Sequence, residues 1–337
     1  MSSPSHLFIG VDGGGTKTAL TLLDAAGSTL AQLTVGSTNP NSVGIEGAKK
    51  TMTEGIHQII QNTGSEYSVQ QVRNVVLSIS GCNSVADAIR MEGWISDLFP
   101  TAVNFRTLTS SSSSSPSSSP SVSLSDASSS LSAPIVTAYN DSIAALVSGT
   151  EGVLDGIVLI SGTGMICKGF RPTTGENGSS VVKEATSCGN GALIDSGSGY
   201  SLGIGVLKVA FASEDGMGPK SILNQAALKY LNLSRTEELV DWLYADRSWD
   251  RVASLAILAF HYGSVAKSED ATPLPGLPPL PKTESEVDQE ARRLLEEGAQ
   301  YLSRSIQAVA ARLEFARDDN FTVSVHSTRV KKQRDRC

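Results

Sequence analysis

The chain has 337 residues, 31 glycines and a formal net charge of −7, and 40% of its residues are hydrophobic. At about 150 residues per domain, this length predicts two domains that each bury a core. The negative charge disfavours a sequence-independent nucleic-acid-binding protein, which needs clustered Lys and Arg. No apolar run approaches the roughly 18 residues of a membrane span, and the polar N-terminus shows no secretory signal. We expect a cytoplasmic α/β protein that binds neither nucleic acid nor a membrane.

The cysteines add a further exclusion. They lie far apart in the sequence and form no CxxC pair, at Cys82, Cys167, Cys188 and Cys337. Structural zinc sites and iron–sulfur sites usually show paired cysteines, and secreted disulfide scaffolds show a high cysteine density. The spacing therefore disfavours all three classes.

The first elements form a meander of three strands. A short apolar run at 7–12 is typical of a buried strand, a glycine turn at 13–18 follows, and alternating patterns predict strands at 19–24 and 28–35. A Rossmann unit would instead show a strand, a turn and a helix. The opening therefore predicts a mixed sheet.

The rest of the first half alternates helices and strands around a serine-rich segment. Helices are expected at 44–61, at 84–98 and, after Asn140-Asp141, through Val147, and strands are expected at 72–79 and 133–139. The apolar stripe of the first helix comprises Ile45, Ala48, Met52, Ile56, Ile59 and Ile60. Residues 110–132 contain 16 serines among 23 residues. This composition cannot bury enough apolar surface to fold, and it predicts a disordered insertion.

The second half repeats the arrangement of strand, glycine turn and strand. A strand at 156–160 enters the turn Ser161-Gly162-Thr163-Gly164, and a strand at 165–170 follows. A glycine-dense loop is expected at 187–205. Helices are then expected at 205–212, 219–231, 235–244, 252–266 and 284–313, with a final strand at 321–325. The repetition predicts one domain at 1–148 and another at 149–337.

Two other segments of the second half are of low complexity. The proline-rich residues 272–281 are compatible with a polyproline ligand or a solvated linker, and the linker is favoured. The basic tail 328–337 is compatible with binding to anionic partners or with a solvated chain end, and the solvated end is favoured.

The first glycine turn has the residue types of a phosphate site. It comprises Gly13, Gly14, Gly15, Thr16 and Lys17. Consecutive glycines let backbone N–H groups face a phosphate without an intervening Cβ. Asp12 precedes the turn and could hold a divalent cation, because hard cations favour carboxylate oxygen. An ordinary glycine hairpin, with Asp12 accepting its N–H groups, is the alternative. The spacing excludes a Walker loop.

A second turn of the same kind strengthens the prediction. Gly162, Thr163 and Gly164 follow the first strand of the second half, just as the earlier turn follows the first strand of the chain. Two such turns can hold a polyphosphate from two sides, which one turn cannot do. The pair therefore predicts a nucleotide site.

The sequence at these turns resembles a known family. Ile9–Thr18 and Leu159–Gly164 resemble the two phosphate motifs of the actin/hexokinase/Hsp70 superfamily. More narrowly, the chain resembles the BadF/BadG/BcrA/BcrD ATPase family and, within it, the N-acetylglucosamine kinases. Further matches are Ser37-Thr38-Asn39 with Gly44, Ser78–Gly81, and Gly189–Gly191 with Asp195–Tyr200. The resemblance covers about residues 7 to 325 without the serine-rich segment.

The resemblance implies a two-lobed actin-like ATPase fold in which each lobe is an RNase H-like mixed sheet flanked by helices. It also implies a kinase that uses ATP and Mg²⁺ to phosphorylate the 6-hydroxyl of N-acetylglucosamine, as a possible homodimer. Asp141 corresponds to the general base, with a helix N-cap as its alternative role. Sugar contacts fall on Asn39, Gly189, Asn190 and Asp195; Asn39 could otherwise be a turn residue and Asp195 a helix cap.

The sequence also departs from the family pattern. Asn190 stands where the family has tryptophan, Ser196 where it has glutamate, and Met165 where the sugar kinases have a small polar residue. The Gly-Gly turn that receives adenosine does not follow the strand at 321–325, so the resemblance predicts an incomplete C-terminal lobe and weak ATP binding.

Other functions remain open at this stage. Because of the missing adenosine turn, a non-catalytic hexosamine-binding protein is the alternative. A dehydratase-activating ATPase would need cysteines that bridge an iron–sulfur cluster, and the spacing of Cys167 and Cys188 disfavours that role. A globular protein without a nucleotide site is the remaining possibility.

Overall fold

The computed structural model describes residues 6–64, 67–104, 133–174, 180–189, 195–246, 248–266, 276–316 and 321–327. The chain divides into two compact units, residues 1–144 and 145–337. The boundary lies inside helix α5 (Asp141–Gly149). No helix among the described residues is both long enough and apolar enough to cross a membrane. The predicted insertion at 110–132 and the tail at 328–337 lie outside the described residues.

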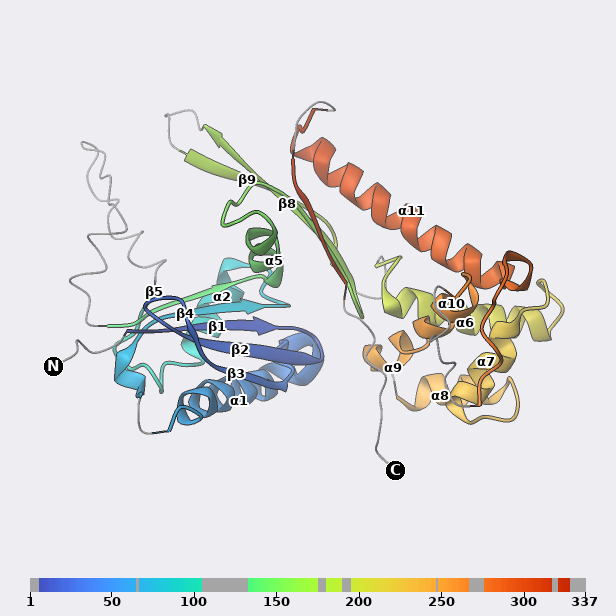
Figure 1. The fold of residues 1–337 in the computed structure, drawn as a ribbon, viewed down its shortest axis with the longest axis horizontal. Helices are drawn as coiled ribbons and strands as arrows, with labels where there is room; N and C mark the ends of the chain where they lie inside the picture. The colour runs from blue at the N-terminus through green and yellow to red at the C-terminus, as the bar shows by residue number, and fades with distance from the viewer. Residues whose placement is uncertain are drawn as a thin grey trace. The chain divides into compact units, whose positions relative to one another are not determined.

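The first unit is built on a six-stranded mixed sheet (Figure 1). Its strands are β1 (Leu7–Gly13), β2 (Lys17–Asp24), β3 (Thr29–Gly36), β4 (Val72–Ile79), β5 (Val103–Asn104) and β6 (Ile135–Tyr139). They lie in the order β3-β2-β1-β4-β6-β5, with β1, β2 and β3 antiparallel and β4 and β6 parallel to β1. The carboxyl ends of the parallel strands β1, β4 and β6 therefore meet at one edge of the sheet.

Two helices pack on this sheet. Helix α1 (Pro40–Gln61) packs against β2 and β3, and α2 (Val85–Gly93) packs against β6. A short 3₁₀ turn spans Val69–Gln71. The helices cover alternating apolar side chains of the strands, and Leu7, Ile9 and Val11 of β1 are at most 3% exposed. The first unit thus has its own core, as its length predicts.

The prediction for α1 was wrong at its N-terminus. The helix begins at Pro40, and Gly44 breaks the helical conformation with a φ of 74°. Ile45, expected in the buried stripe, is 47% exposed, whereas the other five predicted positions are buried. Because Gly44 interrupts the helical geometry, the residues beside the kink do not continue the apolar stripe. Helix α2 is also shorter than predicted and ends at Gly93.

The outer edge of β6 has an unusual partner. In the described part of the chain, strand β5 pairs with Ile135 and Val136 of β6. Beyond it, the backbone N–H of Ala138 donates to Oε1 of Glu92 at 2.9 Å, and this glutamate is only 4% exposed. A side chain of α2 therefore takes the place of a neighbouring strand.

The second unit is built on a four-stranded sheet. Its strands are β7 (Gly156–Ser161), β8 (Met165–Thr174), β9 (Ser180–Cys188) and β10 (Val323–Ser327). They lie in the order β10-β7-β8-β9, with β10 parallel to β7 and the other pairs antiparallel. Read as β9-β8-β7-β10, this sheet has the order and directions of β3-β2-β1-β4. The repetition expected from the sequence is therefore real at the level of topology.

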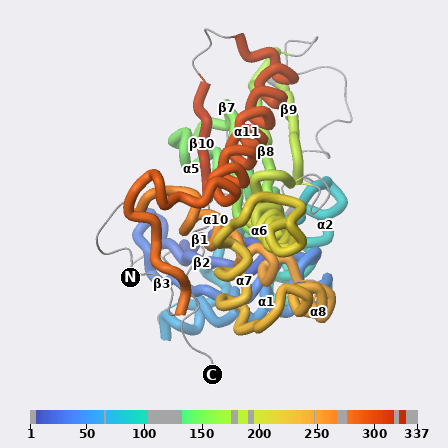
Figure 2. The backbone as a smooth tube through the Cα atoms, turned by 90° about the vertical axis from the view of Figure 1, so that its right-hand side faces the viewer, coloured from blue at the N-terminus to red at the C-terminus, as the bar shows by residue number. Residues whose placement is uncertain are grey.

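Helices follow the first three strands in the described part of the second unit. They are α6 (Gly199–Glu214), α7 (Ile222–Leu231), α8 (Glu238–Ala245), α9 (Trp249–Ala253), α10 (Ala256–Tyr262) and α11 (Gln289–Arg312), with a 3₁₀ turn at Glu284–Glu286. Helix α11 lies along β7, β8 and β9 (Figure 2). Helix α6 packs against α7, α9, α10 and α11. The apolar side chains of the helices form a core separate from that beneath the sheet.

Several boundaries in the second unit differ from the prediction. Strand β9 was not predicted, and β8 extends to Thr174. The helix expected at 252–266 is instead two helices, which separate near Ser254. The Ser254 hydroxyl donates to the carbonyl of Arg251 at 2.7 Å and so competes with the backbone hydrogen bonds of a continuous helix. Helix α11 begins at Gln289 because the side chain of Asp288 accepts the N–H of Ala291.

Helix α6 begins six residues before the predicted start. Its glycines indicated a loop, but they serve helix packing instead. A Cβ on Gly203 would collide with the backbone of Val252 in α9, and one on Gly205 would lie 2.7 Å from a methyl group of Leu294 in α11. Glycine therefore permits three helices to approach closely at this point.

The proline-rich segment is not a solvated linker in its described part, residues 276–281. Pro278 and Pro281 are buried. The hydroxyl of the buried Tyr262 donates to the carbonyl of Pro278 at 2.9 Å, and the N–H of Ala266 donates to the carbonyl of Pro281 at 3.0 Å. Apolar burial and two hydrogen bonds hold this segment against the last residue of α10 and the residues that follow it.

Candidate active site

The first glycine turn joins β1 to β2 and is held firmly by its neighbours. The N–H of Gly14 donates to the carbonyl of Lys17 at 2.9 Å, and the hydroxyl of Ser37 donates to the carbonyl of Gly14 at 2.9 Å. In the part of the chain that the structure describes, no hydrogen bond engages the N–H groups of Gly15 and Thr16. The turn therefore presents two backbone donors from a fixed loop, which is the arrangement that an anion requires.

Gly13 is needed for packing as well as for the turn. A Cβ at this position would lie 2.8 Å from a methyl group of Ile79 and would collide with the hydroxyl of Thr38. The Thr38 hydroxyl is itself hydrogen-bonded to that of Thr18 at 2.8 Å. The strand that leads into the turn thus fits closely against both neighbours.

The second glycine turn joins β7 to β8 and has a similar hydrogen-bond pattern. The N–H of Gly162 donates to the carbonyl of Gly164 at 2.9 Å. The carbonyls of Gly162 and Thr163 accept the N–H groups of Gly199 and Tyr200 at the start of α6, at 2.7 and 3.0 Å. Within the described ranges, the N–H groups of Thr163 and Gly164 form no hydrogen bond. This turn also offers two backbone donors.

Asp141 lies at the sheet edge where β1, β4 and β6 end. It is the first residue of α5 and is partly buried. Burial and, to a smaller extent, the negative charge of Asp12 at the end of β1 together raise the pKa of its carboxyl to about 6. Backbone N–H groups and the hydroxyl of Ser80 oppose this rise. A carboxyl with a pKa near the working pH is suited to accept a proton.

The structure assigns the N-cap of α5, the alternative role considered for Asp141, to the preceding residue. Asn140 precedes the helix, and its Oδ1 accepts the backbone N–H of Ser142 at 3.1 Å. Its Nδ2 donates to Oδ1 of Asn83 at 3.1 Å, which fixes the amide orientation. Asn140 is therefore the N-cap, and the carboxylate of Asp141 is not needed for that purpose.

Asn39 adopts the local role that its position before Pro40 suggested. Its Oδ1 accepts the N–H of Asn41 at 2.9 Å and caps α1, and its Nδ2 donates to the hydroxyl of Ser80 at 3.3 Å. The residue is only 9% exposed. Because Ser80 also contacts Asp141, the structure brings Asn39, Asp141 and Asp12 into one neighbourhood of the first unit.

Asp195 connects three segments of the second unit. Its Oδ2 accepts the N–H of Met165 at 3.1 Å, and its Oδ1 accepts the N–H of Gly189 at 3.0 Å. Ser198, not Asp195, caps α6. The carboxylate thus joins β8 to the end of β9, and its predicted contact with a sugar stays a prediction. Gly189 has a positive φ of 79°, and Asn190 lies outside the described residues.

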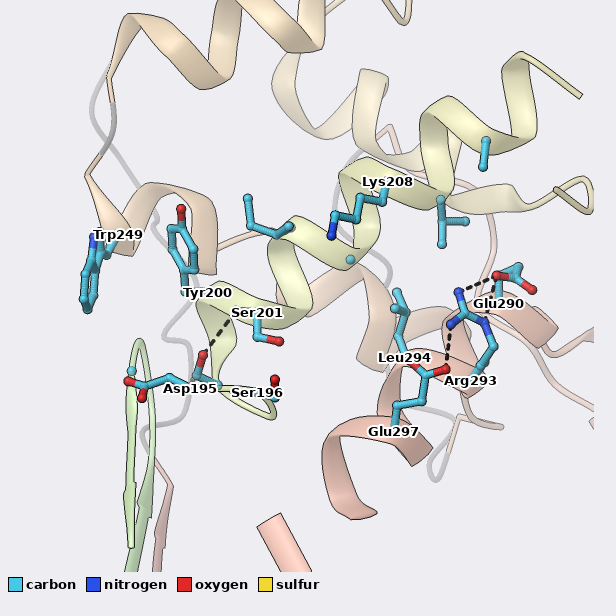
Figure 3. A pocket seen from close by; sticks show the side chains of 16 residues that line it. Asp195, Ser196, Tyr200, Ser201, Lys208, Trp249, Glu290, Arg293, Leu294 and Glu297 are labelled. Atoms are coloured by element: carbon cyan, nitrogen blue, oxygen red, sulfur yellow. Dashed lines mark hydrogen bonds and ion pairs between the residues drawn. The ribbon is translucent and has the colours of Figure 1, made fainter. Parts of the chain in front are cut away.

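A cavity of about 660 Å³ opens beside the second turn (Figure 3). Gly164 and Asp195 line it together with residues of α6 and α11. Tyr200 and Trp249 form an aromatic pair in its wall, with ring centroids 5.7 Å apart. Farther along, Arg293 bridges Glu290 and Glu297 at 2.7 Å each. The second unit thus has a hollow next to its free backbone donors.

The sequence did not single out Ser80 or Asn140 as functional residues. Ser80 was noted only as part of a strand end, and Asn140 only as the start of a helix. The signal was present in both cases, since each polar residue directly follows a buried parallel strand, where ligand sites are commonly found.

The two units define the class of protein. Each has the same order of four strands and a glycine turn after the first strand of its meander, which is the two-lobed actin-like ATPase fold predicted from the sequence. Among the solved structures that share this fold, two have low sequence identity to this chain. One, a provisionally assigned N-acetylglucosamine kinase of Chromobacterium violaceum, covers 96% of this chain and 87% of its own, with 19% identity and a TM-score of 0.59. The other, of Porphyromonas gingivalis with the same provisional assignment, covers 95% and 94%, with 15% identity and a TM-score of 0.52.

Sequence comparison identifies the family. The profile of the BadF/BadG/BcrA/BcrD ATPase family matches residues 9–326, and the chain belongs to this family. It is 33% identical over 263 residues to an N-acetyl-D-glucosamine kinase of Dictyostelium discoideum, covering 76% of this chain and 70% of that protein. It is 29% identical to an N-acetylmuramic acid/N-acetylglucosamine kinase of Clostridium acetobutylicum, covering 70% and 63%.

Proposed function

We propose that this protein is a kinase that transfers the γ-phosphoryl group of ATP to the 6-hydroxyl of N-acetylglucosamine. The observation that carries the proposal is the Asp141 carboxyl, whose pKa is raised to about 6 beside Asp12, at the same sheet edge as the first glycine turn. The two curated relatives, both amino-sugar kinases by name, support the choice of substrate.

In this proposal Asp141 is the general base. Its carboxylate accepts the proton of the sugar hydroxyl, the hydroxyl oxygen bonds to the γ-phosphorus, and the bond from that phosphorus to the β,γ-bridging oxygen breaks to release ADP. The backbone N–H groups of the two turns, at Gly15, Thr16, Thr163 and Gly164, bind phosphate oxygens, and Lys17 supplies a positive charge. Gly13, Gly14 and Gly162 keep these turns compact.

The residues at the sheet edge also fit Mg²⁺. Among the described residues, no group of three or more His, Cys, Asp or Glu could hold a metal ion. Mg²⁺ in kinases is usually held by one or two carboxylates together with the phosphates. Asp12 and Asp141 interact electrostatically, so a pair of carboxylates is present, and Asp12 would hold the ion. When bound, Mg²⁺ would neutralise charge on the phosphates.

The sugar contacts and the assembly are further parts of the proposal. Asn39, Gly189, Asn190 and Asp195 contact the sugar through their polar groups, which discriminate against sugars that leave these groups unpaired. The protein assembles as a homodimer, which analytical ultracentrifugation would test.

The proposal is tested by ADP release in the presence of MgATP and N-acetylglucosamine. The wild type is expected to turn over and to give the 6-phosphate, identified by NMR. Asp141→Ala is expected to lower kcat by about 10²- to 10⁴-fold, the usual contribution of a general base. Turnover at the wild-type rate in this variant would exclude Asp141 as the base, and a wild type that releases no sugar-dependent ADP would refute the function.

A further inference from the structure

Ser80 directly follows β4 and links two parallel strands of the first unit. Its backbone N–H donates to the carbonyl of Gly13 at 2.7 Å, and Gly13 begins the first glycine turn. The position of Ser80 is therefore tied to the turn that precedes β2. Its side chain extends from the same strand edge as Asp141, because the register pairs Ser78 of β4 with Tyr139 of β6.

The Ser80 hydroxyl lies between two polar side chains. Nδ2 of Asn39 donates to Ser80 Oγ at 3.3 Å, and the Ser80 hydroxyl lies beside the carboxylate of Asp141, whose pKa it lowers. A hydroxyl has one proton to donate. Because Asn39 can only donate through Nδ2, that proton is directed to the carboxylate of Asp141.

The orientation of Asn39 is itself determined by the backbone. Its Oδ1 accepts the N–H of Asn41 at 2.9 Å, which leaves the amide nitrogen on the side of Ser80. The neighbouring Gly81 has a φ of 92°, and a Cβ there would lie 2.7 Å from Oδ1 of Asn39. The amide can lie this close because residue 81 has no Cβ. The direction of the hydrogen bonds thus runs from Asn39 through Ser80 to Asp141.

We propose that Ser80 is a positioning residue for Asp141. By donating to the carboxylate, it holds the carboxyl group in one orientation, so that the remaining acceptor positions face the hydroxyl that is to lose its proton. This inference rests on the proposed function, because it assumes that Asp141 is the base. Ser80 contacts neither substrate nor phosphate in this role, and it acts only through Asp141.

Substitutions at Ser80 test the proposal. Ser80→Ala removes the donor, and Ser80→Thr keeps a hydroxyl at the same place. For Ser80→Ala we expect kcat to fall about ten- to a hundredfold, a loss typical of a misplaced catalytic group, with KM for ATP within about threefold of wild type. Ser80→Thr is expected to recover most of the rate. Ser84→Ala removes the N-cap of α2, controls for a loss of stability in the same unit and should leave kcat unchanged.

A double-mutant comparison separates this inference from the proposed function. In an Asp141→Asn background, Ser80→Ala should cost no further rate, because the group that it positions is absent. Independent, multiplying losses in the double variant would overturn the positioning role, as would a Ser80→Ala enzyme within about threefold of the wild-type kcat. The proposed function fails by a different result, namely a wild-type rate in Asp141→Asn alone or no sugar-dependent turnover in the wild type.

Discussion

Asp12 and Asp141 lie close enough at the sheet edge that the negative charge of Asp12 raises the pKa of the Asp141 carboxyl, in addition to the larger effect of burial. A proton acceptor with a pKa of about 6 loses its function as it becomes protonated. We therefore expect kcat/KM to fall tenfold per pH unit below about pH 6 and to level off above it. A pH–rate profile measures this directly.

The same pair predicts the effect of removing one charge. Asp12→Asn should lower the pKa of Asp141 and move the acidic limb of the profile to lower pH, whatever the loss in absolute rate from weaker Mg²⁺ binding. The position of the limb is read after scaling each profile to its plateau. An unchanged limb would show that another group controls the profile.

The raised pKa also predicts a gain in stability when the carboxylate is removed. The pKa of Asp141 is about 6 in the folded protein against 3.8 for an ordinary Asp. The folded state therefore binds the proton more tightly, and ionisation of Asp141 lowers stability as the pH rises from 3.8 through 6. Above pH 6, Asp141→Asn should raise the free energy of unfolding by about 1 kcal/mol, after allowance for the partial exposure of the carboxyl. Denaturant unfolding would show this as a midpoint at higher denaturant concentration. The gain should vanish near pH 4, and a loss of stability at neutral pH would contradict this account.

Gly13 and Gly10 on β1 form a matched pair of test positions. A Cβ on Gly13 would lie 2.8 Å from Ile79 and would strike Thr38, whereas one on Gly10 would meet nothing within 4 Å. Gly13→Ala should therefore cost about 1–3 kcal/mol of stability by overpacking. Gly10→Ala should cost less than about 0.5 kcal/mol or be neutral, as for open surface positions. Urea denaturation of both variants gives the comparison, and equal costs would mean that the packing around the turn is looser than described.

Asp195 should prove important for folding. It accepts two backbone N–H groups, from Met165 and Gly189, and is only 6% exposed. Asp195→Ala leaves both donors without their partner and should cost about 2–4 kcal/mol. Asp195→Asn, which keeps one acceptor oxygen, should cost about half as much. The adjacent Ser196→Ala, which changes the same cavity wall, should be close to wild type in thermal melting. An Asp195→Ala protein of normal stability would leave only a ligand-binding role for this residue.

The sequence predicts those elements of the fold that one local pattern of residues determines. The apolar runs at 7–12 and 72–79 predicted two of the parallel strands, β1 (Leu7–Gly13) and β4 (Val72–Ile79), almost to the residue. Strand β9 could not be predicted in this way, because it lies at the edge of its sheet and has only two of its described positions, Ala185 and Cys188, buried. Glycine signals were misleading in α6, where Gly203 and Gly205 serve contacts with residues distant in the sequence.

The residue types of the candidate site could be predicted from the sequence, but the hydrogen bonds among these residues could not. Asp12 was identified by its place before the glycine turn and Asp141 by the family resemblance, and the structure places them in electrostatic contact. The motifs could not indicate that Asn140 would cap α5, or that Ser80 would join Asn39 to Asp141. These relations depend on the register between β4 and β6, which no local sequence pattern specifies.

The bond from Ala138 to Glu92 has a consequence for behaviour at high concentration. An open strand edge is a template on which other chains can add, and this growth leads to aggregates. By accepting the N–H that β5 leaves uncovered, the side chain of Glu92 occupies a donor that an added strand would need at this edge. The helix that carries Glu92 thus contributes to colloidal stability as well as to the core.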